Sequence, residues 1–387
     1  MKVLFVTRGW PTKDDLMSGN YEAVQAKALA RKGVEVTVLY YDEYSIFKYF
    51  GKKKQEIFIE DGVTVIKLNI FLLVIPFLLN NFKLNCYFIQ LSLKYFYRYY
   101  LRKNSPFDVI HAHSAFRAYA LPPLVRMCNV PFVITEHWSK MNTDQIDEER
   151  REMAKAYPFA DAIITVSKGL ADSLKKKFGI DSIVIHNMVP NSFFDGKIDT
   201  SNDDEIIDFI SVGALLPGKK FDILIKALAN AKNIQKCRLR IVGDGPEKQS
   251  LERCIVDNHV SDRVKMLGLK TPEEVGKLLE EANCFILTSE NETFGIVYIE
   301  GMAKGLPVIA TKCGGPESFV NESNGILVKV DDVEETARAI DYMVEHINDY
   351  DREKIRQYCY ENFSQDQISE QIIKVYDKVL EKRKLEK

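Results

Sequence analysis

Two glutamates flank a glycine in the segment 288–310, which reads T-S-E-N-E-T-F-G-I-V-Y-I-E-G-M-A-K-G-L-P-V-I-A. Gly295 has no side chain, so an anion such as a phosphate can approach its backbone N–H group closely. Glu292 and Glu300 each carry a carboxylate, which only accepts hydrogen bonds and therefore suits the vicinal hydroxyl groups of a sugar. A phosphate contact beside two such carboxylates indicates a site for a nucleotide-diphosphate sugar.

The elements around this segment are expected to place the phosphate at the start of a helix. The apolar run 284–287 predicts a buried strand, 289–293 a polar loop, 294–304 a helix and 308–310 another strand. Free backbone N–H groups and the helix dipole at such a start make an anion site. The N–H groups expected there are those of Phe294, Gly295, Ile296 and Val297. Glu300 is expected to project over the preceding turn, towards the phosphate end.

This segment resembles a motif of a known family. Glu292 and Glu300 have the spacing of the E-x7-E motif of retaining glycosyltransferases with the GT-B fold, in glycosyltransferase family 4. The spacing alone is a weak signal, whereas the string from Glu292 to Ala310, between two predicted strands, is specific. The alternative is that both glutamates only solvate a helix face.

The resemblance implies an α/β fold of two Rossmann-like domains that face each other across a cleft. It covers nearly the whole chain, except the stretch from about 44 to 105. We expect an acceptor-binding domain at 1–194 and a nucleotide-sugar-binding domain at 204–364, joined by a polar linker at 195–205. Residues 365–387 are expected to form a helix that packs back on the first domain.

A second donor-binding loop follows the predicted strand 206–212. It resembles the family pattern V-G-R-L-x-x-x-K-G, in which Gly213 and Lys219 match the glycine and the lysine that meets the donor phosphates. Ala214 stands where the family has arginine, and Lys220 stands where it has glycine. A hydrogen bond to a charged group contributes roughly 1.5–3 kcal/mol, so this loss matters. Lys220 and Arg8 are the candidates to replace the arginine.

The resemblance assigns further roles around the donor. Glu292 is expected to hold sugar hydroxyls and Glu300 the ribose hydroxyls. The donor-binding residues implied are Gly19, Gly213, Lys219, Leu269, Glu292, Phe294, Gly295, Ile296 and Glu300. Gly19 lies in the first loop, which faces the diphosphate in the family, and the backbone around Leu269 holds the base. The ordinary alternative for Gly19 is a loop glycine before a helix.

Two histidines follow predicted strands of the first domain. His113 ends the strand 108–113, and His137 ends the strand 131–137. Ligands of open α/β sheets gather at the carboxyl ends of strands. His137 matches the family's T-x-H histidine, which faces the transferred sugar, and His113 is a candidate acceptor-binding residue. With Lys219 and Glu292, His137 completes the predicted catalytic set; the alternative for either histidine is a structural role.

The stretch from 44 to 105 is basic and aromatic. Its basic residues are Lys48, Lys52, Lys53, Lys54, Lys67, Lys83, Lys94, Arg98, Arg102 and Lys103. Its acids are Glu56, Glu60 and Asp61. Such a surface suits the headgroups of an anionic membrane, while the alternative is that the aromatics pack in the core. RNA is not expected as a partner, because no RNA-binding signature accompanies these residues.

Composition narrows the class of protein. The chain has 387 residues, which favours two domains. Its net charge of −2 gives no overall nucleic-acid signal. Seven scattered cysteines without a C-x-x-C pair argue against a disulfide framework or a zinc site and favour a cytoplasmic protein. Neither a signal peptide nor a membrane-spanning helix is expected, since the most apolar run, 70–79, is short.

These observations predict a retaining glycosyltransferase that moves a sugar, expected from a UDP-sugar, to a saccharide acceptor. A lipid-linked acceptor at the inner face of the cell membrane is expected, in cell-surface polysaccharide or glycan synthesis. No cofactor and no metal is expected, because no D-x-D motif occurs in the relevant loops. The alternatives are a transferase with a soluble acceptor and a nucleotide-sugar-binding protein without activity. A nicotinamide-dependent oxidoreductase is disfavoured, because the first loop lacks G-x-G-x-x-G.

Overall fold

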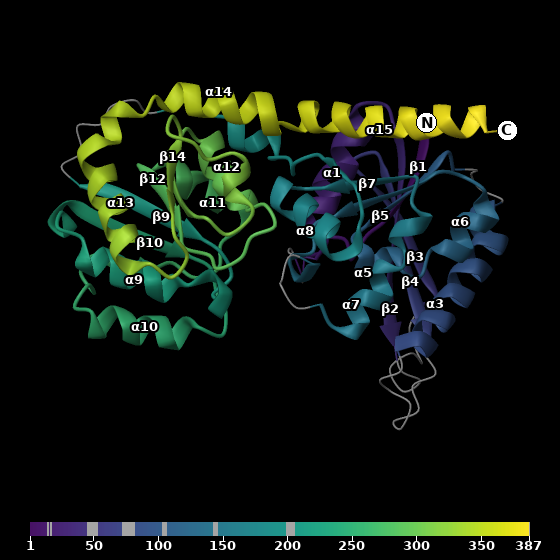
Figure 1. Cartoon of the computed structure of the whole chain (residues 1–387), viewed down its shortest axis with the longest axis horizontal. Helices are drawn as coiled ribbons and strands as arrows, with labels where there is room; N and C mark the ends of the chain where they lie inside the picture. The colour runs from purple at the N-terminus through teal and green to yellow at the C-terminus, as the bar shows by residue number, and fades with distance from the viewer. Residues whose placement is uncertain are drawn as a thin grey trace. The chain divides into compact units, whose positions relative to one another are not determined.

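The computed structural model describes residues 1–13, 15, 18–44, 53–71, 82–102, 107–141, 146–198 and 206–386 (Figure 1). The chain divides into two compact α/β units. The first comprises Met1–Val166, Leu170–His186 and Ile368–Lys387, and the second comprises Ser167–Gly169 and Asn187–Gln367. The predicted α/β class with two domains and parallel sheets is confirmed. Most of the predicted linker, residues 199–205, lies outside the described residues, as does the expected start of the second domain at 204.

The sheet of the first unit has the strand order β3-β4-β2-β1-β5-β6-β7-β8. The strands are β1 Lys2–Val6, β2 Glu35–Tyr44, β3 Gln55–Glu60, β4 Val63–Phe71, β5 Val109–His113, β6 Phe132–Glu136, β7 Ala162–Thr165 and β8 Ile183–Val184. Only β3 pairs antiparallel to its neighbour among these described strands. All five residues of β5 and of β6 are buried, as expected for central strands of a parallel sheet covered on both faces.

The helices of the first unit follow the strands in the order of a parallel α/β domain. They are α1 Asn20–Arg31, α3 Phe82–Phe96, the π-helix η1 Tyr97–Leu101, α5 Ala115–Ala118, α6 Pro122–Cys128, α7 Glu148–Ala154 and α8 Lys168–Phe178. The short 3₁₀ turns are η2 Ser139–Met141 and η3 Tyr157–Phe159. Because the strands are parallel, the loops after β5 and β6 open on the same edge of the sheet.

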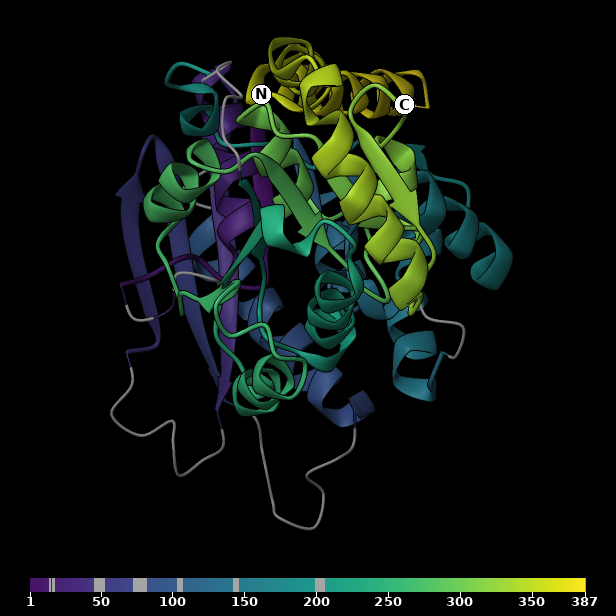
Figure 2. The same ribbon diagram turned by 90° about the vertical axis from the view of Figure 1, so that its left-hand side faces the viewer.

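The basic aromatic stretch supplies β3, β4 and α3, so part of it extends the sheet (Figure 2). Its acids have structural partners. Glu60 accepts a hydrogen bond from Trp10 Nε1 at 3.0 Å and forms an ion pair with Lys27 Nζ at 2.6 Å. Lys27 also pairs with Asp61 at 2.8 Å. Residues 45–52, 72–81 and 103–106, including Lys48, Lys52 and Lys103, lie outside the described residues.

The C-terminal helix α15, Gln365–Leu385, belongs to the first unit from Ile368 onwards (yellow in Figure 1). A buried contact fixes it. Tyr376 Oη lies 2.7 Å from His111 Nδ1, and His111 Nε2 lies 2.7 Å from Thr135 Oγ1. Burial lowers the pKa of His111 to about 3, so this imidazole is neutral and bridges helix α15 to strand β6.

The sheet of the second unit is parallel, in the order β11-β10-β9-β12-β13-β14. Its strands are β9 Ile207–Val212, β10 Cys237–Val242, β11 Val264–Met266, β12 Cys284–Leu287, β13 Val308–Thr311 and β14 Gly325–Val328. Its helices are α9 Phe221–Asn230, α10 Lys248–Asp257, α11 Pro272–Glu280, α12 Ile296–Ala303, α13 Val333–His346 and α14 Arg352–Phe363. Its short turns are η4 Asn191–Phe194, η5 Pro217–Lys219, η6 Ile234–Lys236, η7 Pro316–Ser318 and η8 Ile347–Asp349.

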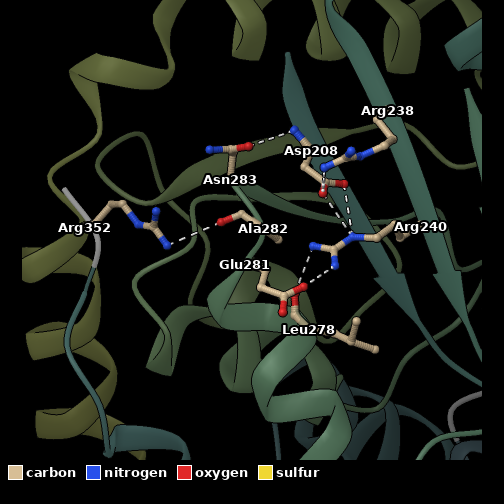
Figure 3. A network of polar contacts seen from close by, with 8 residues as sticks. All are labelled: Asp208, Arg238, Arg240, Leu278, Glu281, Ala282, Asn283 and Arg352. Atoms are coloured by element: carbon tan, nitrogen blue, oxygen red, sulfur yellow. Dashed lines mark hydrogen bonds and ion pairs between the residues drawn. The ribbon is translucent and has the colours of Figure 1, made fainter. Parts of the chain in front are cut away.

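A buried carboxylate joins the strands of the second unit near their amino ends (Figure 3). Asp208 accepts hydrogen bonds from Arg238 at 2.6 Å and from Arg240 at 3.2 Å. Arg240 reaches on to Glu281 at 3.0 Å, and the Asn283 side chain accepts from the Asp208 N–H at 2.8 Å. Because Asp208 and Arg240 are each paired, the network connects β9, β10 and α11 without leaving a buried charge uncompensated.

Candidate functional site

Helix α12 begins at Ile296, two residues later than the sequence predicts. Gly295 adopts the left-handed conformation, with φ +91°, and forms the N-cap. A Cβ at this position would lie 2.6 Å from the Tyr298 ring. Phe294 is fully buried and packs on Phe319 and Phe363, with ring centroids 5.0 and 5.7 Å away. The Phe294 ring is held in this apolar cluster, outside the helix. The helix therefore begins after Gly295, which caps it.

The start of α12 has the free N–H groups that an anion needs. The first turn of a helix leaves its leading N–H groups without an intrahelical acceptor, and here they are those of Gly295, Ile296 and Val297. The Tyr298 N–H already donates to the Gly295 carbonyl at 3.1 Å. The Tyr298 hydroxyl donates to the Leu287 carbonyl at 2.9 Å, which ties the first turn of the helix to the end of β12.

Lys219 and Glu292 contact each other. Lys219 Nζ donates to Glu292 Oε1 at 2.5 Å, and Ser289 Oγ donates to the same oxygen at 2.8 Å. The Glu292 side chain is 12% exposed and that of Lys219 is 26% exposed. The structure thus brings together the two residues to which the sequence assigns the donor sugar and the donor phosphates.

Backbone contacts fix the two loops that carry this ion pair. The Glu290 N–H donates to the Gly218 carbonyl at 2.8 Å, and Thr288 Oγ1 donates to the Lys220 carbonyl at 2.7 Å. From the other side, Thr311 Oγ1 donates to the Ser289 carbonyl at 2.5 Å. Side chains mounted on such cross-linked loops lose little freedom when they bind a ligand, which favours a preorganised site.

Glu300 lies in α12 and is half-buried. Burial raises the pKa of its carboxyl from 4.5 to about 7. Among the described residues, the structure gives this carboxyl no hydrogen-bond or ion-pair partner. A carboxyl with unused acceptor capacity beside the first turn of α12 is suited to hydroxyl groups of a ligand.

The other residues of the donor-binding prediction lie around the same edge of the second sheet. Gly213 follows β9, and its N–H donates to the Val242 carbonyl at 3.0 Å. Leu269 follows β11 and is 71% exposed. Lys220 lies 3.1 Å from Asp331 and 3.6 Å from Glu290, so both of its ion pairs lie within the second unit.

His113 and His137 lie close together in the first unit, with ring centroids 5.7 Å apart. His113 is buried, and burial together with the neighbouring imidazoles lowers its pKa well below the usual value. Its Nε2 atom is buried and has no hydrogen-bond partner in the part of the chain that the structure describes. His137 is half-buried and its Nε2 lies 4.0 Å from Glu22 Oε1. The structure therefore brings these two histidines together, in a different unit from Lys219 and Glu292.

Gly19 forms the N-cap of α1 with φ +67°. A Cβ here would lie 2.1 Å from the Gly9 carbonyl oxygen. The close approach of the loop after β1 to the start of α1 therefore requires glycine at this position. The same helix start carries Glu22, which is buried.

Two glutamates of this region carry no role in the sequence analysis. Glu136 is fully buried, and its carboxylate accepts from the N–H groups of His137 at 3.0 Å, Trp138 at 2.8 Å and Ala115 at 2.8 Å. It also accepts from the Tyr157 hydroxyl at 2.7 Å. Glu136 therefore anchors the backbone after β6. In the sequence, the signal for this anchoring role is an acid within the strand run T-E-H. Glu22 is buried in the first turn of α1. In the sequence it is marked only as an acid shortly after Gly19.

We searched the described residues for helices that could cross a membrane and for groups that could hold a metal ion. No helix among them has both the length and the apolar character needed to cross a membrane. No group of three or more histidine, cysteine, aspartate or glutamate side chains among them is arranged to hold a metal ion.

Comparison with known families gives two matches that together follow the two units. Residues 20–193 match the family described as Glycosyltransferase Family 4, and residues 195–362 match the family described as Glycosyl transferases group 1.

Two relatives and one solved structure are similar to this chain. An uncharacterized glycosyltransferase, MJ1178, of Methanocaldococcus jannaschii is 32% identical over 57% of this chain and 61% of its own length. The lipopolysaccharide core biosynthesis glycosyltransferase LpsE of Rhizobium meliloti is 33% identical over 38% of this chain and 42% of its own length. The chain thus spans less than two thirds of either relative. Anabaena Alr3699/HepE in complex with UDP has a TM-score of 0.75 at 19% identity, covering 98% of this chain and 100% of that chain; another structure of that protein contains UDP-glucose.

Proposed function

This chain belongs to the glycosyltransferases of family 4 with the GT-B fold, and on that premise we propose that it moves a sugar from a nucleotide-diphosphate sugar to a saccharide acceptor. The observation that carries the proposal is the Lys219–Glu292 pair next to the start of α12. A cation for phosphate and a carboxylate for hydroxyls lie within one hydrogen bond of each other there. A UDP-sugar is the proposed donor, because HepE, a protein of the same fold, binds UDP and UDP-glucose.

We assign the diphosphate to Lys219 and to the N–H groups at the start of α12. These donors are in place before the reaction, and the diphosphate gains negative charge as the bond to the sugar breaks. Prepositioned donors at a point of developing charge are a large source of catalysis. This assignment uses the chain's own cation and backbone, without a metal. It requires the Lys219 ammonium, which has three N–H donors, to bind phosphate while it stays near Glu292.

The sugar and the nucleoside have separate carboxylates. Glu292, freed from one of its two hydrogen bonds, accepts from hydroxyls of the transferred sugar, while Glu300 accepts from the ribose. Gly213 and the backbone at Phe294 complete the phosphate contacts, and the backbone at Leu269 contacts the base. In the first unit, Gly19 faces the diphosphate, His137 hydrogen-bonds the sugar and His113 lies on the acceptor side. We propose retention of anomeric configuration, with the acceptor hydroxyl attacking from the side of the leaving group.

A stripe on α3 and η1 supports a lipid-linked acceptor at an anionic membrane. Tyr87, Leu91, Tyr95 and Tyr99 recur every four residues and are 41–64% exposed. Spacing of four places side chains along one side of a helix. Lys94 and Arg98 fall between these residues, Arg102 follows Tyr99, and residues 82–107 contain no acid. Tyrosines and basic side chains together suit the headgroup layer of a membrane.

Flotation with vesicles tests this surface. Vesicles with anionic lipid should carry the wild-type chain upward, and vesicles of neutral lipid alone should not. The double variant Tyr95→Ser, Arg98→Ser should lose most of this binding, because each basic residue contributes about 1 kcal/mol near such a surface. A matched control, Arg338→Ser with Tyr342→Ser on the exposed face of α13 in the second unit, should float like wild type. Equal flotation of the stripe variant would favour the soluble-acceptor transferase.

A nucleotide-sugar-binding protein without activity is the second candidate, and Ala214 in place of the family's arginine favours it. A thermal-unfolding screen against UDP, GDP, ADP and their sugar conjugates separates the candidates. A ligand at a hundredfold excess over its dissociation constant stabilises the folded state by about 2.7 kcal/mol. If the chain is an enzyme, one nucleotide-sugar conjugate should stabilise it, and the chain should slowly split that conjugate and release the nucleotide. Stabilisation by a nucleotide without release, with every acceptor offered, would support the inactive candidate.

A further inference from the structure

Arg117 is a buried cation that uses few of its hydrogen-bond donors. It is 6% exposed and lies in α5, directly after β5. A guanidinium has five N–H donors, but in the described part of the chain it forms one hydrogen bond, from Nη2 to the Arg8 carbonyl at 2.9 Å. Its Nε is buried without such a partner there. The Tyr41 and Phe116 rings, 4.3 and 4.8 Å from Cζ, offset part of the charge and leave most N–H donors unused.

The carboxylate that faces Arg117 stops short of a hydrogen bond. Glu43 lies near the end of β2, and its Oε1 is 3.8 Å from Arg117 Nη1. Burial raises the pKa of the Glu43 carboxyl, and Arg117 opposes this shift only in part. A polar separation above 3.5 Å leaves room for a bridging group. An oxygen about 2.9 Å from each atom fits this gap.

A further unused polar group lies at the same place. Tyr41 is 1% exposed and lies two residues before Glu43, so both side chains are on one face of β2. Its hydroxyl is within range of the Arg117 guanidinium, but the geometry is not that of a hydrogen bond, and within the described ranges the hydroxyl has no partner. The end of β2 and the loop after β5 therefore bring together polar groups that the fold itself does not satisfy.

The backbone before Arg117 is strained. Ser114 has φ +67° and ψ 157°, a region confined almost to glycine. Glu136 accepts the Ala115 N–H at 2.8 Å, and the Arg117 N–H donates to the Ser114 carbonyl at 3.1 Å, which holds the turn. Such strain is concentrated at binding and catalytic sites. Strands β2 and β5 both pair in parallel with β1, so their ends lie at the sheet edge where ligands collect.

The gap suits an uncharged oxygen better than an anion. A phosphate or carboxylate against Arg117 would also lie beside the Glu43 carboxylate, and like charges repel. A hydroxyl both donates and accepts, so one oxygen can satisfy both groups. The half-buried rings of Phe116 and Trp138, with centroids 5.7 Å apart, extend from this place. Aromatic rings around a few polar groups are a typical lining of ligand sites, and they suit the apolar face of a sugar ring.

We propose that Arg117 and Glu43 hold one hydroxyl of the acceptor saccharide between them: Arg117 Nη1–H donates to the hydroxyl oxygen, and the hydroxyl donates to Glu43 Oε1. The role rests on the proposed function, in which the first unit binds the acceptor. It names the class of acceptor at this point as an uncharged sugar ring.

Binding of simple saccharides tests this without a known acceptor. Saturation-transfer NMR on the intact chain would use methyl glucoside, methyl galactoside, methyl N-acetylglucosaminide and glucuronate as probes, with and without UDP. The wild type should saturate at least one uncharged glycoside, and Arg117→Met should saturate none. Arg338→Met, which removes an arginine 3.9 Å from Glu334 on α13, should behave like wild type. Saturation of glucuronate alone, of no probe, or equally in Arg117→Met would overturn the proposal.

Transfer kinetics provide the second readout. Arg117→Met should raise the KM for the acceptor by about 10–100-fold and leave the KM for the donor and its slow hydrolysis unchanged. Glu43→Gln, which keeps the shape of a partly exposed side chain and one acceptor oxygen, should raise the acceptor KM less. The double variant should match Arg117→Met alone, because both residues act on one hydroxyl.

An equal rise in the donor KM would overturn the proposal, because it would mean that the whole unit is disturbed. Failure of the proposed function gives a different result. If the wild type neither binds nor splits any nucleotide sugar, that function fails, and the NMR measurement still decides whether a saccharide binds at Arg117 and Glu43.

Discussion

Lys219 Nζ lies 2.5 Å from Glu292 Oε1, and this bond joins the loop after β9 to the loop before α12. The two residues are 73 positions apart in the chain. Parallel strands β9 and β12 are neighbours in the sheet, so the loops after their carboxyl ends meet at one edge. The pair is therefore a consequence of the topology, and in the proposed reaction it sets the phosphate-binding cation beside the sugar-binding carboxylate.

The effects of substituting Lys219 and Glu292 on the free energy of unfolding should not be additive. Lys219→Met and Glu292→Gln are each expected to lower the free energy of unfolding by about 1–3 kcal/mol, because each leaves the other group partly buried with fewer hydrogen bonds. The double variant should lose less than the sum, by about 1 kcal/mol. Urea unfolding of the four proteins measures this. Strictly additive losses would mean that the ion pair contributes nothing to stability.

Glu300 should make stability and nucleotide affinity depend on pH. Its folded-state pKa of about 7 lies above the ordinary 4.5, so its contribution to stability is complete below about 4.5 and is lost as pH rises through about 7. Between these limits the wild type should lose up to roughly 3 kcal/mol of unfolding free energy relative to Glu300→Gln. Denaturant unfolding of both proteins from acid to neutral pH measures the difference.

The same carboxyl must be ionised to accept two ribose hydroxyls. Binding of the nucleotide should therefore tighten as pH rises through about 7 in the wild type, and calorimetry should show less of this trend in Glu300→Gln. Parallel pH profiles for the two proteins would remove Glu300 from the ribose site.

Gly295 should be sensitive to a methyl group. Gly295→Ala forces a non-glycine residue into the left-handed region and against the Tyr298 ring, which should cost about 1–3 kcal/mol and weaken nucleotide binding. The matched control is Gly276→Ala in the middle of α11, where a Cβ meets nothing within 4 Å. That change should stabilise the chain by about 0.5–1 kcal/mol. Thermal unfolding separates the two, and a Gly295→Ala protein as stable as wild type would contradict the strain.

The stability of the C-terminal helix α15 should depend on the buried hydroxyl group of Tyr376. Tyr376→Phe leaves His111 Nδ1 buried without its 2.7 Å partner, so the free energy of unfolding should fall by about 1–3 kcal/mol. Tyr342→Phe, at an exposed ring that stacks on His346, should change it by less than about 0.5 kcal/mol. Hydrogen exchange should show faster opening of α15 in the first variant alone. Equal protection of α15 in both variants would show that the helix is held by its apolar face.

The sequence predicted most of the local structure of the donor segment because its apolar runs and glycines are strong signals. Strand 284–287 and the start of the next strand at 308 lie where the pattern places them. The helix start was wrong by two residues, since the packing of Phe294 is a tertiary contact that periodicity does not contain. Glu22 and Glu136 were missed for a related reason. Each is a lone acid in sequence, and only the fold brings its partners to it.

Turnover of a nucleotide sugar tests the central claim most directly. Release of nucleotide from UDP-sugars, and from their GDP and ADP counterparts, should be measured for the wild type, Glu292→Gln and the loop control Glu290→Gln. We predict that the wild type turns over one conjugate, that Glu292→Gln slows it by about a hundredfold or more, and that Glu290→Gln behaves like wild type. Turnover that is equal in Glu292→Gln, or no turnover of any nucleotide sugar, would contradict the assignment of this site to the donor.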